Sequence, residues 1–130
     1  MIVDTSVISA ILREESDASA LARALERAPT RRMSTATYVE AAIVTDSNGD
    51  AVLSRRFDEL LRQASIAIEP FTLEQARIAR EAYRDFRKGK HRAGLNFGDC
   101  FAYALAKVTS EPLLFKGDDF RKTDVERADY

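Results

Sequence analysis

The sequence begins MIVDTSVISAIL (residues 1–12), and this stretch places a carboxylate, Asp4, between a short apolar run and a helical pattern. Residues 1–4 predict a short buried strand, and residues 7–14 predict the helix that follows it. Asp4 therefore lies at the carboxyl end of the strand. Taken alone, the pattern favours a helix cap, because an Asp side chain at this place accepts hydrogen bonds from free backbone N–H groups.

The same order of strand and helix recurs along the chain. Apolar runs predict three further strands, at residues 31–36, 65–71 and 112–116. Helical patterns lie between the strands. The first of them begins after Ser16, its predicted cap, and ends at Pro29. The others cover residues 37–47, 51–64, 72–86 and 97–109. Strands that alternate with helices predict an α/β domain with a parallel β-sheet flanked by helices on both faces.

The helical segments carry signals for their ends and for their buried faces. The pair Asn48-Gly49 predicts a turn, Thr72 and Gln75 form a capping-box pattern, and Asn96 caps the last long helix. Apolar residues at helical spacing predict the buried faces of the last two long helices: Leu73, Ala76, Ala79, Tyr83 and Phe86 in one, and Phe97, Phe101, Ala104, Leu105 and Val108 in the other. The charged segment 87–96 contains two glycines, which predicts a mobile loop rather than packed structure.

Length and composition fit one domain over residues 1–130. The chain has 130 residues, of which 45% are hydrophobic, so it can bury one core without disulfides. Its one cysteine, Cys100, excludes an internal disulfide and favours a reducing cytoplasm. The N-terminus lacks the pattern of a signal peptide, and no segment approaches the ~20 apolar residues that cross a bilayer, so we expect no membrane partner.

The charges are unevenly distributed, although the net charge is only −1. Residues 77–92 contain seven basic and two acidic side chains, which leaves the rest of the chain acidic. Such a basic strip is often only the solvated face of a helix. If a metal site lies nearby, however, the same basic strip can bind the phosphate backbone of a nucleic acid while the metal site acts on it, so RNA is the expected partner. The only histidine, His91, lies in this charged region and is expected to contact phosphate or solvent rather than to act as a general base.

Acidic residues follow the predicted strands at places that meet in space. Asp4 follows the first strand, and Asp118 or Asp119 follows the last. The carboxyl ends of parallel strands share one edge of the sheet, which is where ligands of such sheets bind. Asp99, in the first turn of a helix, and Glu40, in a helix after the second strand, can reach the same edge. The sequence therefore predicts a cluster of four carboxylates.

Each acid also has an ordinary structural explanation. Asp99 suits the first turn of a helix through the helix dipole, and Asp118 and Asp119 suit a turn after Gly117. Glu40 can face solvent, but it lies within the apolar run YVEAAIV, where burying a free carboxylate is costly. Each explanation is adequate for its own residue. Together, however, they give no common reason why four acids should lie near one edge of the sheet.

A divalent cation would relieve the repulsion within such a cluster. Mg²⁺ takes oxygen ligands, keeps several waters and binds through one or two carboxylates plus phosphate oxygens, and Mn²⁺ can substitute for it. Such a metal ion can activate water for attack on a phosphodiester. An acidic metal site beside a basic strip therefore predicts phosphodiester cleavage.

Four ordered motifs resemble the PIN-domain family and, within it, the VapC-type toxins of toxin–antitoxin pairs. They are MIVDTSVISAIL, STATYVEAAIV around Glu40, LNFGDCFAYALA around Asp99, and PLLFKGDDF. The resemblance spans nearly the whole chain and implies a single PIN domain that acts as a Mg²⁺- or Mn²⁺-dependent endoribonuclease.

The resemblance also implies roles for individual residues. Asp4, Glu40 and Asp99 carry over as the acidic site, with Asp4 and Asp99 as the metal ligands. Many members of the family have an acid where this chain has Gly117, which leaves Asp118 or Asp119 as the fourth acid, and Asp118 is chosen. Thr5 and Ser6 carry over as hydrogen-bonding partners of the acids. Family membership further implies a homodimer and a cognate VapB-type antitoxin whose tail enters the acidic groove.

Two other functions compete with this interpretation. A receiver domain of two-component signalling has a similar length and sheet, but it would need a pair of adjacent acids after the first strand, where this chain has only Asp4. A non-catalytic PIN-like module that binds RNA or protein is the second alternative. A concentrated acidic site gives an RNA-binding surface no advantage, so the nuclease is favoured.

Overall fold

Four short strands form one parallel sheet at the centre of the structure. The computed structural model describes residues 1–47 and 49–130. Across the sheet the strands are β3 (Ala67–Glu69), β2 (Arg32–Ser34), β1 (Ile2–Val3) and β4 (Leu113–Leu114). All neighbouring pairs are parallel, so the carboxyl ends of the four strands lie at one edge. The predicted α/β fold with a parallel sheet is confirmed.

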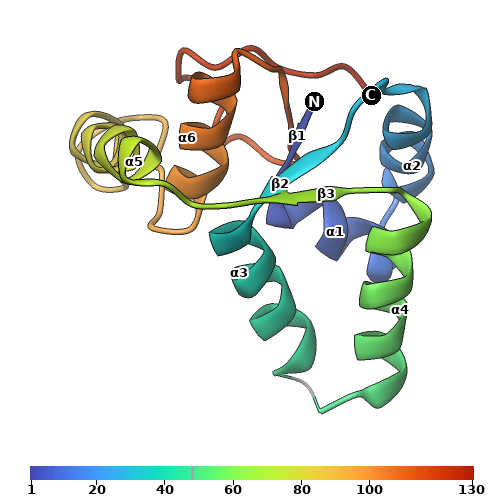
Figure 1. The fold of residues 1–130 in the computed structure, drawn as a ribbon. Coiled ribbons are helices and arrows are strands. Elements are labelled where there is room, and N and C mark those ends of the chain that lie inside the picture. The colour runs from blue at the N-terminus through green and yellow to red at the C-terminus, as the bar shows by residue number, and fades with distance from the viewer. Residues whose placement is uncertain (48) are drawn as a thin grey trace.

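Helices cover both faces of this sheet, as predicted. The described residues form α1 (Thr5–Leu12), α2 (Ala18–Arg27), α3 (Thr35–Asp46), α4 (Ala51–Gln63), α5 (Leu73–Phe86) and α6 (Asp99–Thr109). Strand residues alternate between the faces, so Val3 and Leu114 join a core with α1, α2 and α4, while Ile2 and Leu113 join a second core with α5 and α6. Figure 1 shows α5 and α6 on one side of the strands and α2 and α4 on the other.

Helix α2 begins later than its sequence indicated. Ser16 was predicted to cap it, but the residue before the first helical residue is Asp17, and no side chain caps the helix by a hydrogen bond. The carboxylate of Asp17 instead accepts a hydrogen bond from Nζ of Lys116 at 2.7 Å. The cap prediction was wrong because the helix begins only at Ala18, which puts Asp17 and not Ser16 at its end, and the carboxylate of Asp17 is bound by Lys116.

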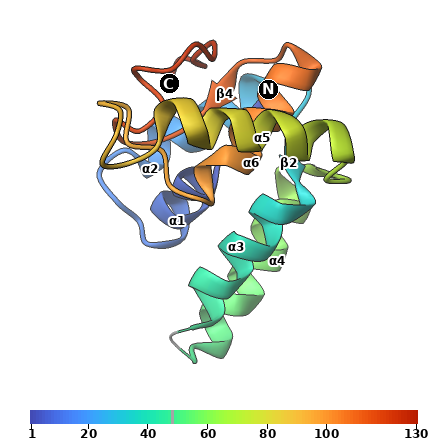
Figure 2. The same ribbon diagram turned by 90° about the vertical axis from the view of Figure 1, so that its left-hand side faces the viewer.

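Helices α3 and α4 form an antiparallel hairpin that projects from the body of the molecule (Figure 2). The rings of Tyr38 in α3 and Phe57 in α4 pack together with their centroids 5.6 Å apart. The side chain of Asp50 caps α4 by accepting hydrogen bonds from two backbone N–H groups. The turn predicted at Asn48-Gly49 includes Asn48, which lies outside the described residues.

The buried face of α5 agrees only in part with the prediction, because Ala79 is buried and Ala76 and Phe86 are half-buried, but the other two predicted residues are exposed. Leu73 and Tyr83 are 67% and 45% exposed, whereas Ala79 and Ala82 are buried against α6. Small side chains at this contact allow the two helices to pack closely, which leaves the larger apolar residues at the margin. Thr72 caps α5 as predicted, since its hydroxyl accepts a hydrogen bond from the backbone N–H of Gln75.

The segment 87–96 is packed, contrary to the prediction of a loop that stays apart from the core. Arg87 and Leu95 form a β-bridge, and Leu95 is fully buried between α5 and α6. Two residues of the predicted buried face of α6 are exposed instead. Phe97, just after this segment, is 75% exposed, and Val108, at the other end of α6, is partly exposed. Two buried apolar residues, Leu95 and Ala93, therefore anchor a segment whose charge and glycine content resemble those of a free loop.

The C-terminal segment runs beside β4 and completes that edge of the sheet. The backbone N–H of Leu113 donates to the carbonyl of Glu126 at 2.8 Å, and the N–H of Ala128 donates to the carbonyl of Leu113 at 2.9 Å. These bonds satisfy the outer side of β4, whose residues would otherwise present unpaired backbone groups. Across the part of the chain that the structure describes, no helix is long and apolar enough to cross a membrane.

Candidate active site

Asp4 lies where β1 turns directly into α1. Its carboxylate caps α1, because Oδ2 accepts hydrogen bonds from the backbone N–H of Ser6 at 3.0 Å and from the hydroxyl of Ser6 at 2.6 Å. The backbone of Asp4 is also fixed, since its N–H donates to the carbonyl of Leu114 at 3.1 Å. The side chain is almost fully buried. Asp4 is therefore both a helix cap and a rigidly held carboxylate at the carboxyl edge of the sheet.

Ser6 joins the ends of β1 and β4. Its hydroxyl donates to Asp4 and accepts a hydrogen bond from the backbone N–H of Lys116 at 3.0 Å. The side chain of Lys116 in turn forms ion pairs with Glu15 and Asp17 at the loop between α1 and α2. These contacts hold the two strand ends that carry candidate acids in a fixed relation.

Glu40 reaches the same edge from the first half of α3. Its Oε2 accepts a hydrogen bond from the hydroxyl of Thr5 at 2.8 Å, so both predicted hydroxyl partners, Thr5 and Ser6, do contact acids. The carboxylate lies against the backbone of Gly98, where an added Cβ would be only 2.6 Å from Oε2. Gly98 has an ordinary helical φ of −64°. The glycine therefore leaves space for Glu40 rather than permitting an unusual backbone conformation, a role that the sequence gave no sign of.

Asp99 is held at the start of α6 by a reciprocal pair of hydrogen bonds with Asn96. The backbone N–H of Asn96 donates to Oδ2 of Asp99 at 2.8 Å, and the backbone N–H of Asp99 donates to Oδ1 of Asn96 at 2.9 Å. Asn96 thus caps the helix as predicted. The Asp99 side chain is buried and keeps one oxygen, Oδ1, free of these bonds.

The structure separates the two acids after β4. Asp118 has an 83% exposed side chain that pairs with Nε of Arg121 at 3.0 Å. Asp119 is also solvent-accessible, and its negative charge adds to the raised pKa of Asp4 and of Asp99. Asp118, the acid chosen from the sequence, is paired with Arg121 instead.

The backbone of Gly117 is the reason that the acids after β4 are at positions 118 and 119 rather than at position 117. Its φ is +101°, in a region that side-chain-bearing residues rarely adopt. An acid at this position would be strained, so a turn of this shape moves the first carboxylates to the next two residues.

Burial and mutual repulsion keep the pKa values of these acids high. Burial raises the pKa of Asp4, while its hydrogen bonds from Ser6 and Thr5 oppose that shift. Burial also raises the pKa of Glu40, and the charge of Asp4 adds to the effect. The pKa of Asp99 rises to about 7 through burial, with further contributions from Asp4, Asp119 and Glu40. Each of these carboxylates therefore lies within the electrostatic range of another.

The donor set fits a divalent metal ion of the kind that prefers oxygen. Asp4 and Asp99 are buried carboxylates whose charges repel each other, and a cation between them would remove that cost. Within residues 1–47 and 49–130, no three acidic, histidine or cysteine side chains are close enough to form a complete ligand cage. Mg²⁺ and similar ions do not need one, because they bind through one or two carboxylates and complete their coordination with water or phosphate oxygens.

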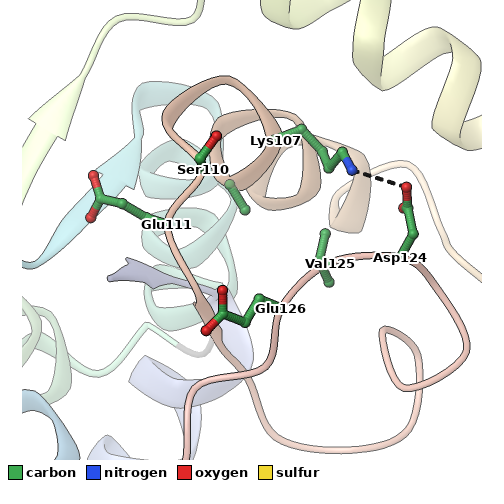
Figure 3. A pocket seen from close by; sticks show the side chains of 7 residues that line it. Lys107, Ser110, Glu111, Asp124, Val125 and Glu126 are labelled. Atoms are coloured by element: carbon green, nitrogen blue, oxygen red, sulfur yellow. Dashed lines mark hydrogen bonds and ion pairs between the residues drawn. The ribbon is translucent and has the colours of Figure 1, made fainter.

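A second group of acids at the opposite end of α6 differs in its electrostatics. Glu111, Asp124 and Glu126 surround a hollow of about 200 Å³ between α6 and the C-terminal segment (Figure 3). Nζ of Lys107 pairs with Asp124 at 2.9 Å, and Nε of Arg32 pairs with Glu111 at 3.1 Å. The hydroxyl of Tyr103 and then the ammonium of Lys107 hold the pKa of Asp124 below its usual range. Acids with such partners have less need of a metal ion.

Part of the predicted basic strip lies on the exposed face of α5, because Lys88, Lys90 and Arg92 belong to the segment after this helix. Arg77, Arg80 and Arg84 of α5 and Arg87 just after it line a hollow of about 550 Å³ together with Tyr83 and Glu81. The guanidinium of Arg87 lies 5.9 Å from the centre of the Tyr83 ring. His91 faces the protein instead: its Nδ1 accepts a hydrogen bond from the N–H of Ala93 at 3.0 Å, and its ring packs on Phe86. Of the aromatic side chains in α3 and α5, Phe86 is half-buried and Tyr38 packs on Phe57 of α4, which leaves Tyr83 accessible.

Comparison with known proteins gives the family. The model of the PIN domain matches residues 1–126, which include all the candidate acids. The chain belongs to the PIN-domain family. Among its PIN-domain relatives, ribonuclease VapC28 of Mycobacterium tuberculosis is 58% identical over 129 residues, which cover 98% of this chain and 97% of that protein. The resemblance to VapC-type toxins is therefore confirmed, and the receiver-domain alternative is excluded.

Solved structures of more distant PIN-domain proteins share the fold. VapC20 of Mycobacterium tuberculosis, a toxin described as cleaving the sarcin-ricin loop, matches with a TM-score of 0.77 and 13% identity over 95% of each chain. A toxin–antitoxin complex from Klebsiella pneumoniae matches with a TM-score of 0.70 and 16% identity, covering 95% of this chain and 92% of that one. At such low identities the likeness concerns the fold alone.

Proposed function

We propose that this protein is a metal-dependent endoribonuclease that acts as the VapC-type toxin of a toxin–antitoxin pair. The observation that carries the proposal is a group of carboxylates at the carboxyl edge of the sheet whose charges act on one another: Asp4 and Asp99 are buried, and Glu40 is half-buried. Keeping these acids buried without a cation costs stability, and natural proteins retain such costs mainly at functional sites. Near-full-length relatives named as VapC ribonucleases support the same activity.

Asp4 and Asp99 are the proposed metal ligands, and Glu40 and Asp119 are the proposed additional acids. Asp119 replaces Asp118 in this role because its charge acts on both ligands, whereas Asp118 pairs with Arg121. Mg²⁺ is the proposed ion and Mn²⁺ a substitute, since both suit a set of oxygen donors.

When bound, the metal ion supplies an activated water for attack on phosphorus and stabilises the negative charge on the leaving oxygen. The chain itself supplies the positioning. Ser6 orients the carboxylate of Asp4, and Asn96 orients that of Asp99 and leaves Oδ1 available. Thr5 holds Glu40 beside Gly98, where the carboxylate can accept a hydrogen bond from a water molecule.

RNA is the proposed substrate, held by the arginine face of α5. Arg77, Arg80 and Arg84 of α5 and Arg87 just after it outnumber the two acids among them, Glu81 and Asp85, and such a row suits the phosphates of an extended strand. The row lies on the helix that packs directly against α6, whose first residue is Asp99. The acids and the arginines thus belong to neighbouring elements of one surface.

The proposal extends to partners and location. A cognate VapB-type antitoxin would inhibit the enzyme by placing its tail in the acidic groove, and a similarly folded protein has been solved as a toxin–antitoxin complex. We further propose a homodimer, as the family resemblance implies. A cytoplasmic location fits the single cysteine, Cys100, which is buried and unpaired in the described structure.

The proposal is tested by incubating purified, antitoxin-free protein with total cellular RNA in Mg²⁺, in Mn²⁺ and in EDTA. Asp4→Asn and Asp99→Asn remove charge at constant size, and Asp118→Asn is the matched control. We expect discrete fragments that require metal, vanish with the first two variants and persist with the third. Folded wild-type protein that binds RNA and cuts none would favour the non-catalytic PIN-like module instead.

A further inference from the structure

An apolar groove begins at the candidate active site and ends at the arginine face. It consists of two adjoining hollows of about 470 and 520 Å³ that share Ala36, Phe97 and Phe101. Glu40 and Gly98 line the first hollow, and Arg80 lines the second. We call this surface the aromatic groove; its large side chains are Val39, Ile43, Phe71, Tyr83, Phe97 and Phe101.

Phe97 is the most exposed large apolar side chain of the aromatic groove, with 75% of its surface accessible. Its ring is nevertheless held in place: the centroid lies 4.8 Å from that of Phe101 in an edge-to-face contact, and Phe101 makes a similar contact with Phe71 at 5.0 Å. The residue lies between Asn96, which is bonded to Asp99, and Gly98, which touches Glu40. An aromatic ring that packs on Phe101 and keeps most of its surface accessible therefore lies in the same hollow as Glu40.

The two ends of the groove indicate what occupies it. Arg80 and Tyr83 line both the groove and the hollow of the arginine face, so the apolar surface continues into a row of cations. At its other end lies Glu40, one of the acids of the candidate active site, beside Gly98, the residue before Asp99. A single strand of RNA has both features that this surface needs, since it carries a phosphate for the arginines and the metal and a base with an apolar face for the rings.

We propose that Phe97 stacks on an unpaired base next to the scissile phosphate, so that the aromatic groove selects single-stranded RNA. This inference rests on the proposed ribonuclease function. Bases in a duplex are stacked on each other and cannot reach a protein ring, whereas the bases of loops and ends can be splayed out. Stacking tolerates every base, so the groove selects strandedness more than sequence.

The test compares Phe97→Leu, which keeps an apolar side chain, with Phe97→Tyr, which keeps an aromatic ring. Val52→Ala is the matched control, because Val52 is an exposed apolar residue of α4 outside the groove. Cleavage of a single-stranded oligonucleotide gives kcat and KM. We expect Phe97→Leu to raise KM roughly 5- to 100-fold with kcat little changed, from the usual effect of losing one stacked base. Phe97→Tyr and Val52→Ala should match the wild type.

A second readout does not depend on cleavage. In the Asp99→Asn background, an oligonucleotide that contains the fluorescent base 2-aminopurine should be quenched on binding, because stacking on an aromatic ring quenches it. Adding Phe97→Leu should abolish the quenching, and Phe97→Tyr should restore it. Quenching together with no cleavage by wild-type protein would support the stacking and refute the proposed function.

Two results would overturn the inference while leaving the ribonuclease intact. One is a KM for Phe97→Leu equal to that of the wild type. The other is a loss of activity in both Phe97 variants together with a change of oligomeric state in analytical ultracentrifugation, which would make the groove a protein interface.

Discussion

Gly98→Ala offers a sharp test of the active-site geometry, because it should impair the enzyme without harming the fold. An added Cβ would overlap the whole carboxyl group of Glu40: it would meet Oε1 and Cδ first and would lie 2.6 Å even from Oε2, whereas ordinary contacts are 3.4–4 Å. The carboxylate must therefore retreat by about 1 Å or more. Misplacement of a catalytic group by about 1 Å can cost about 100-fold in rate, so we expect a loss of 10- to 100-fold in kcat/KM.

The stability of the variant should change little. Alanine is favoured over glycine in a helix by up to about 1 kcal/mol, and Gly98 already has a helical φ. Against this stands the weakened hydrogen bond between Thr5 and Glu40, which contributes about 1 kcal/mol. The two effects oppose each other, so the free energy of unfolding should stay within about 1 kcal/mol of the wild type, as measured by urea denaturation.

A double-mutant cycle separates this mechanism from a general disturbance of the site. In a Glu40→Ala background there is no carboxylate to displace, so adding Gly98→Ala should leave the residual activity unchanged and only stabilise the protein. Wild-type activity of Gly98→Ala, or an equal further loss in both backgrounds, would refute the argument that Gly98 acts by leaving space for Glu40.

Three further predictions concern Ser6 and the acids of the site. Ser6→Ala removes the hydroxyl that bonds to the carboxylate of Asp4 and to the backbone N–H of Lys116, so it should lower the free energy of unfolding by about 1–3 kcal/mol. It should also weaken Mg²⁺ binding about 10-fold in calorimetry, and an unchanged Mg²⁺ affinity would contradict the proposal that Ser6 positions Asp4. Asp119→Asn should reduce cleavage of RNA by about 10-fold, whereas Asp118→Asn should not, and the reverse order would restore Asp118 as the fourth acid. In EDTA the protein should become less stable as the pH rises from about 4 to 8, because the folded state keeps a proton on Asp99 up to about pH 7 that the unfolded state loses near 3.8. Urea titrations should show that the free energy of unfolding falls by at most about 4 kcal/mol over this pH range. The Asp99→Asn variant should show a smaller fall, and added Mg²⁺ should oppose it. A wild-type protein whose free energy of unfolding does not change with pH would disprove the raised pKa of Asp99.

The order of elements could be predicted because it follows from local patterns. Short apolar runs followed by amphipathic segments require a parallel sheet covered on both faces, and Val3 and Ile2 duly enter opposite cores. Strand ends were predictable for the same reason. This is why Asp4 could be expected at the carboxyl edge before any coordinates were known.

Burial was predicted less well wherever packing between helices decides it. Tyr83 and Phe97 are apolar and correctly spaced, yet both are exposed, because α5 and α6 meet through small residues such as Ala79. Leu95 shows the opposite case, as a fully buried residue in a charged, glycine-containing segment. Helical spacing defines a face but not the partner that covers it.

The sequence by itself determined that carboxylates would follow the strands of a parallel sheet, since strand direction and the covalent order of residues place Asp4 and the 118–119 pair at one edge. Packing in three dimensions was needed to find that Asp118 pairs with Arg121 while the charge of Asp119 acts on Asp99, and that Gly98 makes room for Glu40. The reason is physical: the direction of a side chain in a turn, and the space beside a carboxylate, depend on contacts between segments that are far apart in the chain.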